Sequence, residues 1–244
     1  MGEDARVAIV GGGVAGCSLA YHLAQLGWDD VVLLEQAELT SGSTWHAAGL
    51  CTQFNSSYNV MGLLRYSIEL YRRLECDYHE CGSVRLAASE DRLDEFHTRA
   101  AMAELVGVPI EVVDLDRLHE LHPLVSTEGL LAAAYLPTDG HVDPSSLTNA
   151  FVAGTPSLRV LRRTRVTAAR REGGAWLLET TGGEIRAEVV VNAAGQWAPQ
   201  VARLAGHELP IIAMQHHYVV TEPLAEVGAL ARELPVLRDP DASY

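Results

Sequence analysis

A glycine-rich turn between a buried strand and a helix constrains this chain more than any other feature. Residues 6–10 form a short apolar run typical of a buried parallel strand, and a glycine-rich stretch, 11–16, follows directly. Apolar residues at helical spacing over 19–26 predict a helix, and a second apolar run, 31–34, ends at Glu35. The order strand, glycine turn, helix, strand and acid predicts the first βαβ unit of a Rossmann-like α/β fold.

The glycines of this turn predict a dinucleotide site. Gly11 permits the tight turn, Gly13 lets the backbone approach a pyrophosphate, and Gly16 allows the helix to pack closely on the strand. The unpaired N–H groups at the start of the helix then bind the diphosphate. Glu35 can accept both ribose hydroxyls, and its charge disfavours a 2′-phosphate, so NADP is not expected. An ordinary parallel-sheet turn is the alternative explanation of the glycines.

The charged residues exclude several functions. All 18 basic residues are arginines, so no lysine is present for a Walker-type phosphate loop, a pyridoxal Schiff base or a Tyr-x-x-x-Lys reductase pair. With 32 acidic residues the formal net charge is −14, and neither nucleic acid nor an anionic membrane is expected as a partner.

Cysteine usage and the first residues bear on the compartment. Cys17, Cys51, Cys76 and Cys81 have neither CxxC spacing nor the density of a disulfide scaffold, so we expect reduced thiols. No apolar run reaches the ~18 residues of a membrane span, and the start of the sequence leads directly into a strand without a secretory or transit peptide. We therefore expect a cytoplasmic protein, or one of the mitochondrial matrix if a leader has been trimmed.

The segment after Glu35 favours FAD over NAD as the dinucleotide. An NAD domain normally continues with another helix and strand, whereas residues 36–50 are mostly small residues and glycines, with hydroxyls at Ser41, Ser43 and Thr44. Small residues let a loop lie against a flat ring system, and hydroxyls can bind its phosphates or carbonyls.

Residues 43–49, with the sequence STWHAAG, resemble the flavin-attachment segment of the dimethylglycine and sarcosine dehydrogenase family. In that family the histidine is bonded to the 8α-methyl group of FAD, and His46 is the matching position. The resemblance therefore implies a covalently bound FAD, which cannot dissociate and is a stronger oxidant. A loop histidine that binds a phosphate or a backbone group is the alternative for His46.

The second half of the chain contains a further flavoprotein pattern. Short strands are expected over 160–161, 165–168, 175–180 and 185–187, and they lead into the run 188–198, which contains Asn-Ala-Ala-Gly. This resembles the β-meander of glutathione-reductase-like FAD enzymes, which rejoins the central sheet and ends beside the cofactor. By resemblance, Val166 meets the adenine through its backbone and Trp197 lies near FAD, although a core aromatic residue is the alternative for Trp197.

The expected FAD-binding residues lie in four segments: the glycine turn, the end of the second strand, the flavin-attachment segment and the meander. They are Gly11, Gly13, Val14, Ala15, Gly16, Glu35, Gln36, Gly42, Ser43, Thr44, Trp45, His46, Ala47, Ala48, Gly49, Leu50, Val166, Gly195 and Trp197.

On the substrate side, residues 210–221 resemble a family strand that faces the flavin ring. His216 matches a family histidine in the amine pocket and would help to supply the free base, because a protonated nitrogen has no lone pair to assist hydride departure. A purely structural role is the alternative for His216. Tyr244 falls near a pair of family tyrosines that contact substrate. The substrate carboxylate needs a cation, which must be an arginine in this chain, and the sequence does not indicate which one.

Several other elements follow from periodicity and capping. They are helices over 61–76, 92–107 and 114–121, a strand over 82–87, and a helix that Asp143 caps, with Pro144 at its first position, ending near Gly154. Asp139 and His141 lie in a stretch that resembles the family, and we interpret it as a turn rather than an acid–base pair. The spacings of His119 with His122 and of His216 with His217 do not indicate a metal site, so none is predicted.

The resemblance covers residues 6–244 and implies two domains. A discontinuous FAD-binding domain would comprise 5–60 and 145–205, and an α+β substrate subdomain, truncated at its C-terminal end, would comprise 61–144 and 206–244. The rest of the substrate sheet and the folate-binding region that uses tetrahydrofolate in this family are absent from the sequence, so we interpret the chain as a fragment or a truncated gene product.

These observations predict an FAD-dependent oxidation that removes an N-methyl group from dimethylglycine or sarcosine, a reaction of choline and glycine betaine degradation and of one-carbon metabolism. The small methylated amino acid is the expected substrate partner, and oxygen or an electron-transfer flavoprotein would reoxidise the flavin. One alternative is a non-catalytic regulator resembling the regulatory subunit of pyruvate dehydrogenase phosphatase, which lacks the Trp-His pair present here as Trp45 and His46. An NAD-dependent dehydrogenase is the other.

Overall fold

The computed structural model describes residues 3–241 of the chain. Contacts between Cα atoms divide it into two units. The first comprises Met1–Ala48, Leu74–Cys76 and Asp143–His217, and the second comprises Gly49–Arg73, Asp77–Val142 and Tyr218–Tyr244. Each unit has its own sheets and its own buried apolar clusters.

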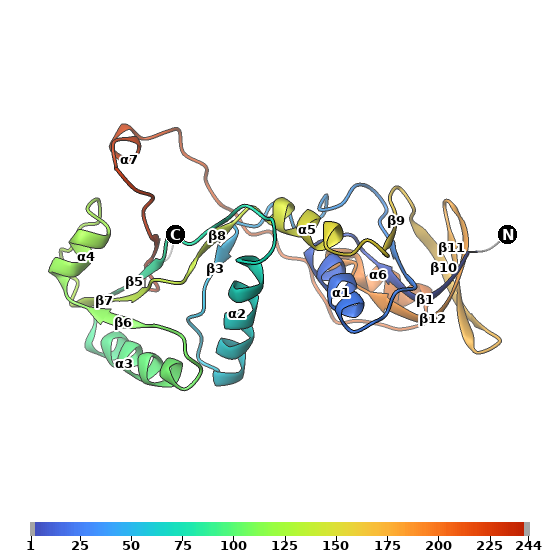
Figure 1. The fold of residues 1–244 in the computed structure, drawn as a ribbon, viewed down its shortest axis with the longest axis horizontal. Helices are drawn as coiled ribbons and strands as arrows, with labels where there is room; N and C mark the ends of the chain where they lie inside the picture. Colours follow the sequence, from blue (N-terminus) through green and yellow to red (C-terminus); the bar gives the residue numbers. More distant parts are fainter. Residues whose placement is uncertain (1–2, 242–244) are drawn as a thin grey trace. The chain divides into compact units, whose positions relative to one another are not determined.

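The first unit is built on a six-stranded sheet with the order β10-β11-β12-β1-β2-β9 (Figure 1). Strand β1 (Glu3–Val10) pairs in parallel with β12 (Gly183–Asn192) and β2 (Val31–Leu34), and β2 pairs in parallel with β9 (Arg159–Leu161). Strands β10 (Val166–Glu172) and β11 (Ala175–Thr180) extend the sheet as an antiparallel meander. The expected βαβ unit and the meander that rejoins the sheet beside β1 are both confirmed.

Burial of both sheet faces explains why the central strands are almost uniformly apolar. Alternate residues, such as Val10 and Leu34, belong to a core cluster that packs against Val201 and Leu204 of α6 (Ala198–Leu204). The intervening residues, such as Ile9, are equally buried. A strand buried on two sides has no position for a polar side chain.

Two helices of this unit were expected from the sequence, and α5 matches its predicted bounds while α1 begins earlier than its apolar spacing indicated. Helix α1 (Val14–Gln25) begins directly after Gly13 and packs against α5 (Pro144–Ala153). Asp143 caps α5 and accepts a hydrogen bond from the Ser146 N–H at 2.5 Å. A 3₁₀ turn, η1 (Gly195–Trp197), leads from β12 into α6.

The second unit contains two small sheets. One has the order β13-β5-β7-β6, in which β5 (Ser83–Ala87) and β6 (Glu111–Val113) pair antiparallel with β7 (Ala132–Leu136), while β13 (Val236–Arg238) pairs in parallel with β5. The other is the antiparallel sheet of β3 (Leu50–Cys51), β8 (Gly140–Val142) and β4 (Tyr78–His79).

Four helices belong to the second unit: α2 (Tyr58–Tyr71), α3 (Glu90–Glu104), α4 (Leu115–Leu121) and α7 (Ala225–Gly228). Asp114 caps α4 as expected and accepts the Arg117 N–H at 2.8 Å. The helix expected over 61–76 is displaced, because it begins at Tyr58 after an extended Ser57 and ends at Tyr71. The apolar spacing that extended the predicted helix to residue 76 continues into the turn that follows Tyr71.

The strand expected over 210–221 is wrong, because this segment has no regular secondary structure. A strand is stable only when a neighbouring strand satisfies its backbone, and none of the described strands pairs with these residues. Its large apolar side chains are exposed to solvent. The exposed fraction is 82–89% for Ile212, Met214, Val219 and Val220. Between residues 3 and 241, no helix is both long enough and apolar enough to cross a membrane.

A buried carboxylate organises the loops of the second unit. Asp139 is fully buried, and its Oδ2 accepts hydrogen bonds from the hydroxyls of Thr52 and Ser83, both at 2.7 Å. Its Oδ1 accepts the backbone N–H of Gln53 at 2.9 Å. Two segments far apart in the sequence, 52–53 and Ser83, are thereby fixed to one side chain, consistent with a structural rather than an acid–base role for this turn.

We expect Asp139→Ala to lower the free energy of unfolding by about 3 kcal/mol, because it leaves several buried donors without an acceptor. Asp143→Ala removes only an exposed helix cap and should cost about 1 kcal/mol. Urea unfolding of both variants, followed by circular dichroism, measures the difference. Equal losses in the two variants would contradict this account of Asp139.

Candidate functional site

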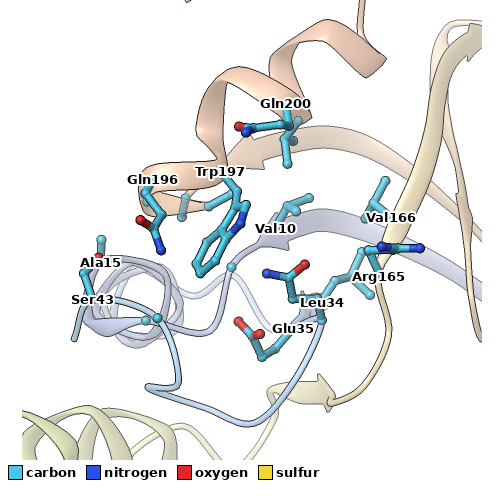
Figure 2. A pocket seen from close by; sticks show the side chains of 18 of the residues that line it. Val10, Ala15, Leu34, Glu35, Ser43, Arg165, Val166, Gln196, Trp197 and Gln200 are labelled. Carbon is cyan, nitrogen blue, oxygen red and sulfur yellow. The ribbon is translucent and has the colours of Figure 1, made fainter. Parts of the chain in front are cut away.

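A cavity of about 620 Å³ lies in the first unit at the carboxyl ends of β1 and β2, where open α/β sheets bind ligands (Figure 2). This volume is in the range of small-molecule and cofactor sites, about 300–1,000 Å³. Twelve of the residues expected to bind the cofactor line it: Gly11, Gly13, Val14, Ala15, Glu35, Gln36, Gly42, Ser43, Thr44, Val166, Gly195 and Trp197.

The glycine turn leaves no room for side chains. Gly11 has a φ of +120°, and a Cβ there would lie 2.3 Å from the Ala193 carbonyl oxygen. Gly16 does not line the cavity but packs the helix onto the turn, because a Cβ there would lie 2.0 Å from the Gly11 carbonyl oxygen. A Cβ on Gly13 would lie 2.9 Å from the Thr44 hydroxyl. The bare backbone at the start of α1 is thus open to a ligand.

The Glu35 carboxylate is held in place by two backbone groups. Its Oε2 accepts the Gly12 N–H at 2.7 Å, and its Oε1 accepts the Ala37 N–H at 2.8 Å. A carboxylate has about four acceptor positions, so each oxygen can still accept a ligand hydroxyl. Figure 2 shows this side chain directed into the cavity from the end of β2. Its fixed orientation suits recognition of a ribose.

The flavin-attachment segment divides into a part at the cavity and a part beyond it. Gly42, Ser43 and Thr44 line the cavity, and the Thr44 hydroxyl accepts the Val14 N–H at 3.1 Å. Trp45 and His46 follow as exposed residues whose rings lie 3.7 Å apart between centroids, and neither lines the cavity. The loop is therefore anchored to the start of α1 just before these two rings.

The end of β12 forms the opposite side of the cavity. The Asn192 side chain donates to the Ala198 carbonyl at 2.8 Å and accepts the Ala194 N–H at 3.2 Å, which shapes the turn. Gly195 has a φ of +55°, and the Trp197 ring lies 3.1 Å from the position of a Cβ on Gly42. Trp197 is 38% exposed, so it is not the core aromatic residue of the alternative interpretation.

Several further residues line the cavity although no sequence pattern singled them out. Thr164, Arg165, Thr167, Gln196 and Gln200 also face the cavity, and Figure 2 shows Arg165, Gln196 and Gln200 around its rim. Arg165 immediately precedes the singled-out Val166, so its position along the meander was the available signal. The polar residues of η1 and α6 follow the Ala-Ala-Gly turn, but nothing in their spacing indicates which of them face inward.

The remaining expected site residues lie elsewhere. Ala47 and Ala48 are exposed. Gly49 and Leu50 belong to the second unit, where the Gly49 carbonyl accepts a hydrogen bond from the Val142 N–H at 3.0 Å. His216 is exposed in the irregular segment after α6. Tyr244 lies outside the described residues.

Below the glycine turn, Cys17 on α1 is fully buried. Burial raises the pKa of its thiol to about 12, and the nearby Glu35 carboxylate adds to this effect. The thiol is therefore protonated at neutral pH and acts as a small apolar side chain.

Comparison with known proteins identifies the family of this chain. Residues 6–244 match the family described as "DAO: FAD dependent oxidoreductase", and the chain belongs to this family. The nicotinamide alternative is therefore wrong.

Individual relatives show which members of this family the chain is similar to. The chain is 46% identical over 251 residues to dimethylglycine dehydrogenase, mitochondrial, of Rattus norvegicus, covering 99% of this chain and 29% of that protein. It is 35% identical to human sarcosine dehydrogenase, mitochondrial, covering 99% of this chain and 28% of that protein. It is 36% identical to the mitochondrial pyruvate dehydrogenase phosphatase regulatory subunit of Mus musculus, covering 90% and 26%. The chain thus spans less than a third of the length of these relatives.

Among solved structures, L-proline dehydrogenase from P. horikoshii has a similar fold. It superposes with a TM-score of 0.79 at 25% identity, over 84% of this chain and 57% of that one. This confirms the expected α/β fold of FAD-dependent oxidoreductases.

The residues at the cavity fit FAD. A glycine turn whose space a Cβ would fill suits a diphosphate, and the anchored Glu35 suits a ribose. The apolar Val166, which lines the same cavity, suits an adenine. The coarse expectation of FAD as the cofactor is therefore confirmed by the family and is compatible with the geometry.

We expect Glu35→Gln to weaken FAD binding at least about tenfold, because a neutral amide replaces a charged acceptor that the backbone orients. The change is best made together with His46→Ala, so that binding is reversible, and measured by quenching of FAD fluorescence.

Glu38→Gln is the matched control, because Glu38 pairs with Arg163 on the surface and does not line the cavity. If the two variants bind FAD equally, Glu35 does not hold the ribose.

Proposed function

We propose that this chain is the FAD-binding part of an enzyme that oxidatively demethylates dimethylglycine or sarcosine. The observation that carries the proposal is the cavity at the glycine turn, flanked by the STWHAAG segment, in a chain 46% identical to dimethylglycine dehydrogenase. Bound FAD would supply a hydride acceptor for the N-methyl carbon. The chain's own residues would bind the cofactor, orient the amine and keep it unprotonated.

His46 is the proposed covalent attachment point of the flavin. Thr44 fixes the loop to the start of α1, and Trp45 packs against the His46 ring, so the imidazole is both restrained and exposed. A neutral, accessible ring nitrogen is what attack on the 8α-carbon of a flavin requires. Trp45 is then a positioning residue that limits the rotation of His46.

His216 and Tyr244 are proposed on the substrate side. An imidazole near the amine would accept its proton and so provide the free base. His216 is exposed, so its ring is accessible for this role. Changing His216 to Ala should then alter the pH profile of amine oxidation.

Arg85 is the arginine that we propose for the substrate carboxylate. It lies on β5, stacks on Phe54 at 4.4 Å, and its buried Nε has no hydrogen-bond partner among residues 3–241. Burial lowers its pKa to about 10, and Arg238 adds to this effect, so an anion would stabilise its charge. Within the described part of the chain it forms no ion pair, unlike most of the surface arginines.

The finer assignments follow from the same proposal. The first unit would hold FAD and the second would contribute to substrate binding, as in the domains 5–60 with 145–205 and 61–144 with 206–244. An electron-transfer flavoprotein is the proposed electron acceptor, with oxygen as the alternative.

The relatives reported above carry the word mitochondrial in their names, which favours the matrix and gives no support to the cytoplasmic expectation.

A regulatory role is the second candidate, because the pyruvate dehydrogenase phosphatase regulatory subunit is also a relative. By resemblance that protein lacks the Trp-His pair, which this chain has at Trp45 and His46. Absence of any flavin adduct, together with absent amine oxidation, would favour this candidate.

We expect the protein to stay yellow after acid precipitation and the peptide containing His46 to carry the mass of FAD. His46→Ala should abolish the adduct while leaving reversible FAD binding, because only the bonding nitrogen is lost. Trp45→Phe keeps a ring beside His46 and should retain most of the adduct. A colourless precipitate from wild-type protein supplied with FAD would rule out the covalent link.

We expect Arg85→Gln to weaken dimethylglycine binding about tenfold or more, since a charged carboxylate contact is removed. The flavin absorbance change on titration with dimethylglycine measures this. Arg73→Gln is the control, because Arg73 is exposed and its side chain donates to the Glu69 carbonyl of the preceding helix turn. Unchanged affinity in Arg85→Gln would show that another cation binds the carboxylate.

A further inference from the structure

Two histidines face each other across neighbouring strands of the second unit. His79 on β4 is the register partner of His141 on β8, and their rings stack with centroids 4.7 Å apart at an interplanar angle of 15°. Cross-strand partners project from the same face of a sheet. Glu233, from the segment between α7 and β13, lies against both rings.

The three side chains place their ligand atoms close together. His79 Nδ1 lies 3.0 Å from Glu233 Oε2, and His141 Nε2 lies 2.5 Å from Glu233 Oε1. The three candidate ligand atoms all lie within 4.8 Å of one another. Ligands at about 2.0–2.1 Å from a tetrahedral zinc ion are roughly 3.3 Å apart, so only small side-chain shifts would centre an ion among them.

A second carboxylate sets the orientation of His79. Its Nε2 lies 3.1 Å from Asp77 Oδ1, on the opposite side of the ring from Glu233. When Nε2–H donates to Asp77, neutral His79 presents its Nδ1 lone pair to the Glu233 carboxylate. Two acceptors then face each other, and either a proton or a metal ion must lie between them. The same carboxylate–histidine arrangement supports the ligands of many metal sites.

The charge of the cluster favours a divalent ion. Glu233 and Asp77 together carry two negative charges, and two neutral imidazoles would add none. Imidazole nitrogen suits first-row transition ions such as zinc, and a carboxylate oxygen completes a common three-ligand set. The side chains of His79, His141 and Glu233 are 36–47% exposed, so an ion can enter and water can complete its coordination.

We propose that His79, His141 and Glu233 bind one zinc-type divalent ion, with Asp77 orienting His79. The ion would join the segment before β13 to the β4–β8 pair within the second unit. Its role would be structural, because it would cross-link parts of the chain separated by 62 and 92 residues. The sequence predicts no metal site, since these three residues share no short motif.

Zinc binding to chelator-treated protein, measured by isothermal titration calorimetry, tests the proposal. We expect one ion per chain, and a loss of affinity of at least tenfold in His141→Gln and in Glu233→Gln. Asp77→Asn should lose about tenfold, because supporting carboxylates typically contribute 10–100-fold to metal affinity. Zinc should also raise the Tm of the wild-type protein and not that of a His79→Gln/His141→Gln double variant.

His97→Gln and His119→Gln are the controls, since both remove exposed histidines outside the cluster and should leave affinity within about twofold. Circular dichroism of each variant checks that it is folded. The proposal is overturned if wild-type protein shows no saturable one-to-one binding, or if the folded double variant binds zinc as the wild type does. The cluster would then be only a hydrogen-bonded ion-pair network.

Discussion

The close approach of Gly11 to the Ala193 carbonyl is the constraint on which the candidate site depends. It brings the turn after β1 against the turn after β12, although 182 residues separate them, and only a residue without a Cβ at a φ of +120° fits there. The same approach opens the backbone at the start of α1 and places Gly195 and Trp197 across from it. A Cβ at position 11 would clash with the Ala193 backbone, so one of the two turns would have to move.

From this contact, a chain of backbone hydrogen bonds fixes the polar groups of the site. Gly12 and Ala37 orient Glu35, and Val14 holds Thr44 and with it the loop that leads to His46. The functional side chains are therefore set by main-chain geometry, which costs little reorganisation when a ligand binds. The cation proposed for the substrate, Arg85, is positioned differently, by stacking and burial without a carboxylate partner among the described residues.

Sequence alone was sufficient where structure is decided locally. The βαβ unit, the caps at Asp114 and Asp143 and the meander follow from short patterns of apolar spacing, glycine and capping residues, and the structure confirms them. The strand over 210–221 was expected only from a family resemblance, but a strand also needs a pairing partner, and pairing is not local. The Asp139 network and the His79–His141–Glu233 cluster could not be predicted for the same reason. Each joins residues that lie far apart in the sequence.

Hydrogen–deuterium exchange of the His46→Ala protein, with and without added FAD, tests the central claim most directly. The account predicts that FAD slows amide exchange in the peptides that span 11–17, 42–44 and 193–200, while α3 and α4 of the second unit are unaffected. Protection confined to other segments, or no protection at saturating FAD, would contradict the assignment of this cavity to the cofactor.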